Sequence, residues 1–301
     1  MSDMPLHMKR ISRLPFPLCN GLNSFQLKII ALVFMTLGHT VMFLKTIVPV
    51  VNDYDVIVQA ICRFSALLFL YIVVESGHHT RSKGKFLLRL YLAGLIMGLI
   101  NFFLAEAGLY ANFRIFYTLF YTLLFSFLLE SIWNSVKDKN WKHLALCSMG
   151  IVIAWFPHWL SVYMHRGLPQ LFPNLEASQL FTIMDLVKAI IPSPMETEYQ
   201  FLFIAMGIVW YLVRERHWQM FLFAVFCGIS LAGNIYMNGI DGFFGPFYEI
   251  FLDNQYWMIL ALPFIWLYNG QRGRKMKALF YLYYPLHLYL LIGIAALFGG
   301  Y

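Results

Sequence analysis

Charged residues are scarce in this sequence. Asp, Glu, Lys and Arg make up 12% of its 301 residues, whereas hydrophobic residues make up 60%. Soluble domains carry about 25% charged residues, so this chain lacks the polar side chains that would cover a soluble globule of its length. No soluble domain of useful size remains between its long apolar runs. The sequence therefore predicts an all-α, polytopic integral membrane protein, with the lipid bilayer as its main surroundings.

Other signals are missing as well. The four cysteines, Cys19, Cys62, Cys147 and Cys227, are too far apart to suggest a metal clip or a redox pair, so we expect neither a metal nor a disulfide. The N-terminal segment lacks the compact apolar region and cleavage site of a secretory signal. The net charge is +7, but the basic residues lie in short separate tracts. Nucleic acid is therefore not an expected partner.

Apolar runs of a length that can cross a bilayer dominate the rest of the chain. Such a crossing takes about 20 helical residues. The expected spans number about nine: 26–47, 57–77, 87–105, 113–133, 142–162, 199–213, 217–236, 254–268 and 276–297. Residues 1–25 then form a cytoplasmic or interfacial arm, and residues 26–301 form a single transmembrane helical domain.

The distribution of charge predicts the orientation of these spans. Most Lys and Arg residues lie in the N-terminal arm and in every second loop after it, whereas acidic residues collect in the other loops. Basic loops stay in the cytoplasm. We therefore expect the N-terminus inside, the C-terminus outside, and a multi-pass location in the inner or plasma membrane of the cell.

Two of the predicted outer segments are longer than a simple connection. Residues 164–198 contain an amphipathic stretch that is expected to lie flat on the outer interface. Ser193, Pro194 and Glu196 then read as the N-cap, N1 and N3 positions at the start of the sixth span. Residues 237–253, rich in glycine and aromatic residues, are either an outer binding loop or an ordinary interfacial turn.

Three ionisable side chains are predicted at one depth inside the membrane. His39 follows Lys28 by eleven residues, and His287 follows Lys277 by ten, so each histidine lies roughly 15–16 Å above the cytoplasmic interface. Arg63 reaches a similar depth from the outer side. A single buried histidine usually only satisfies a hydrogen bond, and an arginine can extend to the interface. Their shared depth favours a functional site, because ionisable groups are costly in hydrocarbon.

The chemistry of these groups suits two kinds of function. An imidazole can take a proton from a hydroxyl or amine nucleophile, and an arginine can hold an oxyanion or a carboxylate. The same groups would also serve a proton relay in a transporter. Residues Arg81, Lys85 and Arg89 form a basic tract before the third span. That tract is either a topology signal or a site for an anionic cofactor.

Three stretches of the chain resemble the TraX family of membrane proteins. They are 27–39, 63–90 and 261–288, and the last is the most specific, with Tyr268-Asn269-Gly270, Arg272-Gly273 and Tyr284-Pro285-Leu286-His287. TraX is associated with N-terminal acetylation of conjugative pilin subunits, and the family is similar to transmembrane acyltransferases that modify envelope glycans. Those enzymes have a basic residue, ten intervening residues and a histidine in their first helix, which Lys28 and His39 match. The chain has Gly38 where TraX-like first helices usually have Asp, and it has Arg81, Lys85 and Arg89 in place of an Arg-x-x-Arg motif.

The resemblance implies transfer of an acyl group, expected to be acetyl, from cytoplasmic acetyl-CoA to an acceptor in the envelope. A pilin-subunit N-terminus is the first acceptor to expect, and the hydroxyl of a surface glycan or lipid is the alternative. His39 would act as general base or transient acyl carrier, and Arg63 and His287 would orient the substrate or stabilise charge. Lys28, Arg81, Lys85 and Arg89 would hold the acyl-CoA. Two alternatives belong to other classes of function: a proton-coupled secondary transporter and an assembly factor that performs no chemistry.

Overall fold

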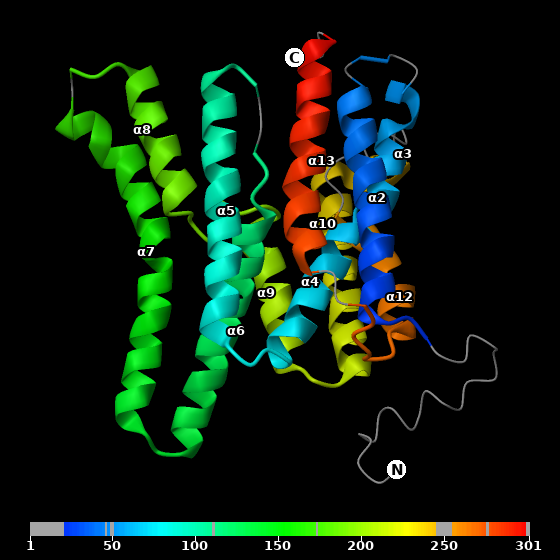
Figure 1. Ribbon diagram of the computed structural model, residues 1–301, viewed down its shortest axis with the longest axis vertical. Coiled ribbons are helices and arrows are strands. Elements are labelled where there is room, and N and C mark those ends of the chain that lie inside the picture. The colour runs from blue at the N-terminus through cyan, green and yellow to red at the C-terminus, as the bar shows by residue number, and fades with distance from the viewer. Residues whose placement is uncertain are drawn as a thin grey trace. The chain divides into compact units, whose positions relative to one another are not determined.

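The computed structural model describes residues 21–45, 47–48, 51–109, 112–172, 174–244, 255–274 and 277–298 (Figure 1). Across these residues every regular element is a helix, so the expected all-α class is confirmed; the only pairing between extended segments described is an isolated bridge between Leu22 and Tyr268. The described residues divide into two compact units. The first unit lies within Met1–Ile72 and Glu215–Gly300, and the second is Val73–Arg214.

The first unit contains both ends of the described chain. Its helices are α2 (Ser24–Leu44), α3 (Asn52–Cys62), most of α4 (Phe64–His78), α10 (Arg216–Phe244), the 3-10 helix η2 (Gln255–Ala261), α12 (Leu262–Leu267) and α13 (Lys277–Leu297). The second unit contains the end of α4, α5 (Lys83–Glu106), α6 (Ile115–Lys137), α7 (Trp141–Leu171), α8 (Ala177–Ile190) and α9 (Gln200–Leu212).

The helices agree with a multi-pass membrane protein. Six are long and apolar enough to cross a bilayer: Ser24–Leu44, Ile57–His78, Lys83–Glu106, Ile115–Lys137, Trp141–Gly167 and Leu279–Leu297. Phe201–Leu212 and Tyr256–Leu267 are shorter apolar helices, and α10 covers the predicted seventh span. Every predicted span therefore falls on a helical segment. The number of nine crossings and their orientation remain predictions.

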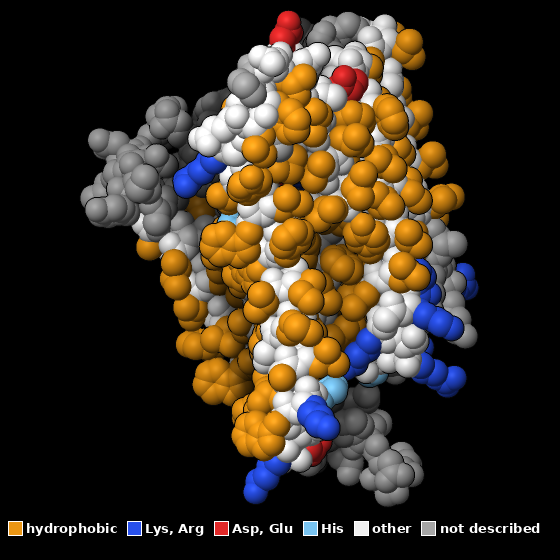
Figure 2. Space-filling model, turned by 90° about the vertical axis from the view of Figure 1, so that its left-hand side faces the viewer, with side chains coloured by type: hydrophobic (Ala, Val, Ile, Leu, Met, Phe, Trp, Pro, Cys, Tyr) orange, Lys and Arg blue, Asp and Glu red, His pale blue; other side chains and the backbone are white. Residues whose placement is uncertain are grey.

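Apolar side chains cover much of the outer surface of the second unit. Along α7 the large exposed residues are Val152, Ile153, Phe156, Trp159 and Tyr163. On the face drawn in Figure 2, hydrophobic side chains form a broad band, with Lys and Arg gathered mainly toward its lower end. Such a band suits contact with lipid tails, because a soluble monomer rarely exposes so large an apolar area.

The segment 164–198 differs from its sequence prediction. Its amphipathic stretch forms α8, which packs along α5: Thr182 hydrogen-bonds to Glu106 (3.0 Å), and a Cβ built on Gly98 would lie 2.7 Å from the carbonyl oxygen of Ala189. The eight residues from Gly98 to Glu106 and the seven from Thr182 to Ala189 advance similar distances, roughly 11–12 Å. Helix α8 therefore descends beside α5 and does not lie on an interface by itself, so that prediction was wrong.

Helix α9 continues the descent after an interruption at residues 191–199. It ends beside the start of α5, because Tyr211 donates to Glu130 (2.5 Å) and Glu130 also pairs with Lys83 (2.6 Å). With 13 residues, α9 is roughly 20 Å long, too short for the roughly 30 Å hydrocarbon core. Helices α8 and α9 together cover the length of α5, and thus form one interrupted helical path beside it.

The predicted N-cap of the sixth span was also wrong. Helix α9 begins at Gln200, after Tyr199 in the left-handed region (φ 63°). Ser193 instead closes a tight turn, in which its hydroxyl accepts from the Met195 N–H (3.2 Å) and its carbonyl accepts from the Glu196 N–H (3.1 Å). The Ser-Pro-x-Glu pattern fits both local structures, because each uses the serine oxygens to satisfy nearby N–H groups.

Two predicted features lie outside the part of the chain described. These are most of the N-terminal arm, 1–20, and most of the outer segment 237–253, of which only the backbone of 237–244 is described.

The close contact of α5 and α8 can be tested with Gly98→Ala. The added methyl group would meet the Ala189 carbonyl at 2.7 Å, so the helices must separate, and we expect a loss of about 1–3 kcal/mol. Gly84→Ala on the same helix is the matched control, because its Cβ would meet nothing within 4 Å. Thermal unfolding of the purified protein in detergent would measure both. Equal stability of the two variants would contradict this packing.

The orientation can be tested with topology reporters. A reporter inserted after Lys139, between α6 and α7, should behave as cytoplasmic, and one inserted after Asn174, between α7 and α8, as external. The reason is the positive charge of Lys137, Lys139 and Lys142 near the first insertion point. The reverse pair of results would contradict the predicted orientation.

Candidate functional site

Helices α2 and α13 lie side by side in the first unit and run in the same direction. Three contacts that follow in the same order along both helices show this. Lys28 Nζ lies 5.0 Å from the centre of the Phe280 ring, the Thr36 and Tyr283 hydroxyl oxygens are 2.8 Å apart, and His39 meets His287 further along both helices. Parallel first and last helices are what an odd number of crossings requires.

The two predicted catalytic histidines are in direct contact. His39 Nδ1 lies 3.0 Å from His287 Nε2, and the rings are stacked with their centres 5.2 Å apart. His287 is buried, with 7% of its surface exposed. Counting residues from Lys28 and Lys277 predicted an equal depth for these groups, and the packing of α2 on α13 turns that into a contact.

The hydrogen bonds define the tautomers of the neutral pair. His287 Nδ1 lies 2.8 Å from the Tyr283 carbonyl oxygen, which can only accept, so His287 Nδ1 carries the proton. Its Nε2 is then the acceptor, and His39 Nδ1 must donate to it. In neutral His39 the basic nitrogen is consequently Nε2. Helix α13 thus orients the His39 ring through His287 and leaves the basic nitrogen directed away from that partner.

Arg63 follows a residue that packs beside His39, but its side chain is not joined to the histidine pair. It forms the turn between α3 and α4, directly after Cys62. A Cβ built on Gly38 would lie 2.9 Å from the Cβ of Cys62, so the Cys62 side chain, next to Arg63, packs closely against Gly38, next to His39. Within the described residues no hydrogen bond or ion pair links the Arg63 side chain to either histidine. The same contact explains Gly38, because an Asp side chain there would collide with Cys62.

The basic end of the first unit is closed by a segment that sequence reasoning did not assign. The Leu22 N–H donates to the Leu267 carbonyl (2.7 Å), the Asn269 N–H to that of Leu22 (2.8 Å), and the Ser24 N–H to that of Gln271 (2.7 Å). Residues 267–271 therefore hold the start of α2. The available signal was the block Tyr268 to Gly273, which carries the most specific part of the resemblance.

Glycines make this close approach possible. Gly21 and Gly273 both have positive φ, 57° and 64°. A Cβ on Gly21 would lie 2.6 Å from the Leu267 carbonyl oxygen, and one on Gly273 would lie 2.6 Å from Asn23 Oδ1. Asn23 in turn caps α2, accepting from the Gln26 N–H (3.0 Å).

Basic side chains surround this closed end. Arg216, the first residue of α10, donates to the Tyr268 carbonyl and lies over the Tyr268 ring, 5.5 Å from its centre. Its Nε is buried and has no partner among the described residues. Arg272 and Arg274 are exposed on either side of Gly273. The N-termini of α2 and α10 meet here, and helix N-termini favour anions.

The predicted acyl-CoA residues fall in both units. Lys28 belongs to the first unit, with the histidine pair. Arg81, Lys85 and Arg89 belong to the second, at the start of α5, and all three are exposed. The four residues are therefore divided between the two units, and their common role in binding acyl-CoA stays a prediction.

No metal centre is apparent in the described part of the chain, where no three His, Cys, Asp or Glu side chains are grouped so as to hold an ion. Cys62, Cys147 and Cys227 are buried free thiols, and Cys19 lies outside the described residues.

Comparison with known proteins adds one finding. Neither a curated protein nor a solved structure matches the chain. The model of the TraX protein family matches residues 170–295, a range that runs from the end of α7 through most of α13. The matched range includes His287 and the whole Tyr268–Gly273 block. The resemblance predicted from the sequence is thus confirmed, and the chain is recognised as TraX-like.

Proposed function

We propose that this protein is a membrane-embedded acyltransferase that moves an acetyl group from cytoplasmic acetyl-CoA to an acceptor in the cell envelope. The observation that carries the proposal is the His39–His287 pair, set deep in two continuous parallel helices. The recognition as TraX-like supports a pilin-related role in conjugation, and hence a pilin-subunit N-terminus as the first acceptor. The hydroxyl of a surface glycan or lipid is the alternative acceptor.

His39 is proposed as the general base. With its Nδ1 committed to His287, its Nε2 takes the proton of the attacking amine or hydroxyl. The nucleophile then forms a bond to the thioester carbon, and the carbon–sulfur bond of acetyl-CoA breaks to release CoA. His287 orients His39 and shares the positive charge that the proton brings. Arg63, which follows Cys62 at the level of Gly38, is the proposed partner of the oxyanion.

The donor is proposed to bind at the basic end of the first unit. Lys28, Arg272 and Arg274 offer positive charge to the phosphates of acetyl-CoA, near the end of α2 from which the helix runs toward His39. Eleven residues of helix separate Lys28 from His39, roughly 16 Å. The pantetheine arm of CoA is long and thin enough to follow such a path. The tract Arg81, Lys85 and Arg89 is the second candidate for the phosphates.

A proton-coupled transporter remains the proposal from another class, because a paired histidine also suits a proton relay. The two are distinguished by comparing envelope extracts from cells with and without the gene by mass spectrometry. A mass difference of one acetyl group on an envelope component supports the transferase, and its absence supports the transporter.

The chemical step is tested with His39→Ala. Loss of a general base typically costs about 10²–10⁴-fold in rate, so acetylation of the envelope component should fall by that factor. His287→Ala should impair transfer less, because water can partly replace an orienting group. His217→Ala is the control, since that histidine is exposed and contacts only Glu215 and Trp218 among the described residues. Acetylation within a few-fold of wild type in His39→Ala would refute the catalytic role.

The donor site is tested by charge reversal of two matched pairs, Arg272→Glu with Arg274→Glu and Lys85→Glu with Arg89→Glu. Both double variants change the net charge equally. We expect the first to weaken acetyl-CoA binding by about tenfold or more, and more strongly at low salt, because exposed charges are screened. Equilibrium binding to the purified protein would measure this, after the topology of each variant has been checked. A larger effect of the second pair would assign the phosphates to the Arg81–Arg89 tract.

A further inference from the structure

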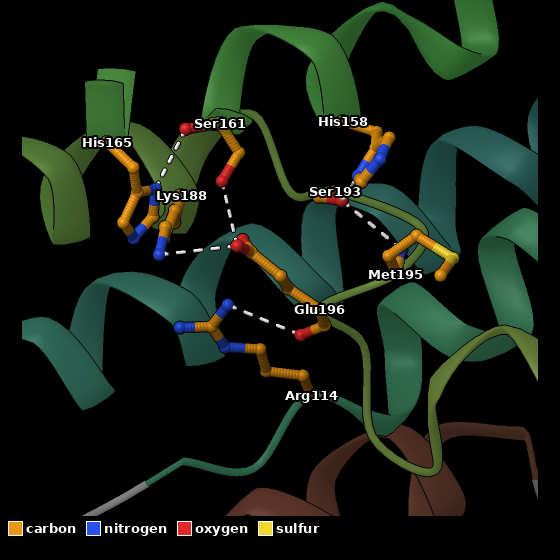
Figure 3. Close-up of polar contacts among 8 residues, drawn as sticks. All are labelled: Arg114, His158, Ser161, His165, Lys188, Ser193, Met195 and Glu196. Atoms are coloured by element: carbon orange, nitrogen blue, oxygen red, sulfur yellow. Dashed lines mark hydrogen bonds and ion pairs between the residues drawn. The ribbon is translucent and has the colours of Figure 1, made fainter. Parts of the chain in front are cut away.

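The interruption between α8 and α9 gathers polar side chains from four parts of the second unit (Figure 3). They are Arg114 before α6, His158, Ser161 and His165 on α7, Lys188 on α8, and Ser193 and Glu196 in the interruption itself. The sequence assigned none of these residues to a functional site; Ser193 and Glu196 were predicted only as capping residues of the sixth span. Their convergence at one place is a consequence of the break.

The cluster lies within the depth of the helical layer. The contact between Gly98 and Ala189 marks the end of α8, and Gly98 is 15 residues, or roughly 22 Å, from Lys83 at the basic end of α5. It is eight residues, or roughly 12 Å, from Glu106 at the other end. Irregular backbone at such a depth occurs in membrane proteins where it is buried in protein or lines a polar cavity. Interrupted helices often form ligand sites for the same reason.

Glu196 is the centre of the cluster. Its Oε1 accepts from the Ser161 hydroxyl (2.7 Å) and pairs with Lys188 Nζ (3.3 Å). Its Oε2 is buried and has no partner among the described residues. A buried carboxylate oxygen without a donor is costly. The site is thus built to receive one more hydrogen-bond donor.

The charges around Glu196 limit what that donor can be. Lys188 offsets the charge of Glu196. The Arg114 guanidinium donates to the backbone carbonyl of Glu196 (3.4 Å), and the backbone N–H of Arg114 donates to the Glu198 carboxylate (3.1 Å). Two cations and two carboxylates leave no net charge. A cluster without net charge cannot offset the charge of a phosphate or an ammonium group, so either would add an unpaired charge at this depth.

The remaining groups both donate and accept hydrogen bonds. The Ser193 hydroxyl accepts from the Met195 N–H and lies 3.4 Å from His158 Nδ1. His165 Nδ1 donates to the Ser161 carbonyl (2.8 Å). Imidazole and hydroxyl groups complement ligand hydroxyls, which likewise donate and accept.

We propose that the interruption between α8 and α9 binds a neutral, hydroxyl-rich group such as a sugar ring, with one ligand hydroxyl donating to Glu196 Oε2. Ser161 and Lys188 hold the carboxylate in position from its other oxygen. The site belongs wholly to the second unit. It is argued from binding alone and does not depend on acyl transfer.

The test uses the full chain in lipid nanodiscs and two photoreactive probes of equal alkyl length, a dodecyl maltoside and a dodecylphosphocholine. Cross-linked peptides are mapped by mass spectrometry. We expect the maltoside probe to label peptides covering 155–166 and 188–199 about tenfold more than the phosphocholine probe, since a hydrogen bond to a charged group changes affinity by that order. Excess dodecyl maltoside should compete. If free maltose also competes, the natural ligand is a free sugar. If free maltose does not compete, the ligand is a lipid-linked sugar.

Glu196→Gln should lower labelling of these peptides about tenfold, because it removes the carboxylate that accepts the ligand hydroxyl. Glu176→Gln, the same change at the exposed N-cap of α8, should not. Equal labelling by both probes, or wild-type labelling of folded Glu196→Gln, would overturn the proposal. Should Glu196→Gln fail to fold, the comparison of the two probes on the wild-type chain decides alone. His39→Ala should leave the labelling unchanged, which separates this proposal from that of acyl transfer.

Discussion

The constraint on which the second unit depends is that backbone polar groups inside an apolar layer must find partners within the protein. The interruption between α8 and α9 leaves a run of carbonyl groups without helical partners. Side chains of neighbouring helices donate hydrogen bonds to these carbonyls. Tyr117, Tyr121 and Tyr91 donate to the carbonyls of Ala189 (2.5 Å), Pro192 (2.6 Å) and Ile190 (2.8 Å). Thr118 donates to the carbonyl of Glu198 (2.8 Å). Side chains at the start of α6, together with Tyr91 of α5, thus replace hydrogen bonds that a continuous helix would have made.

The need for hydrogen-bond partners also explains why the pattern of polar and apolar residues gave a wrong prediction for α8. The stretch that forms α8 has an apolar side and a polar side, and the same pattern describes a helix lying on a membrane surface. What distinguishes the two cases is the set of partners, Tyr91 and Tyr117 on α5 and α6, which lie 60 or more residues away in sequence. Local pattern carries no information on such a distant contact. By contrast, the long spans are visible from hydropathy alone, because lipid contact depends only on the residues of each helix.

The candidate site shows the same division between what the sequence predicts and what it leaves open. The depths of His39 and His287 follow from counting along straight helices, and the structure brings the two rings to 3.0 Å. The direction of their hydrogen bond could not be predicted, since it rests on the Tyr283 carbonyl one turn before His287. The contact of Gly38 with Cys62 could not be predicted either. This contact explains why a glycine stands where the resemblance leads one to expect a carboxylate.

The two polar sites differ in how the backbone supports them, and this difference bears on their roles. His39 and His287 project from helices that continue on both sides of them, although Pro285 removes one backbone N–H from α13. Their rings are thus held by regular elements, as a chemical step requires. Glu196 lies on irregular backbone that is held by side chains of α6. Such backbone presents its own N–H and C=O groups, together with side chains, to anything that enters. A rigid pair suits proton transfer and an interruption suits recognition, and the chain contains one of each, in separate units.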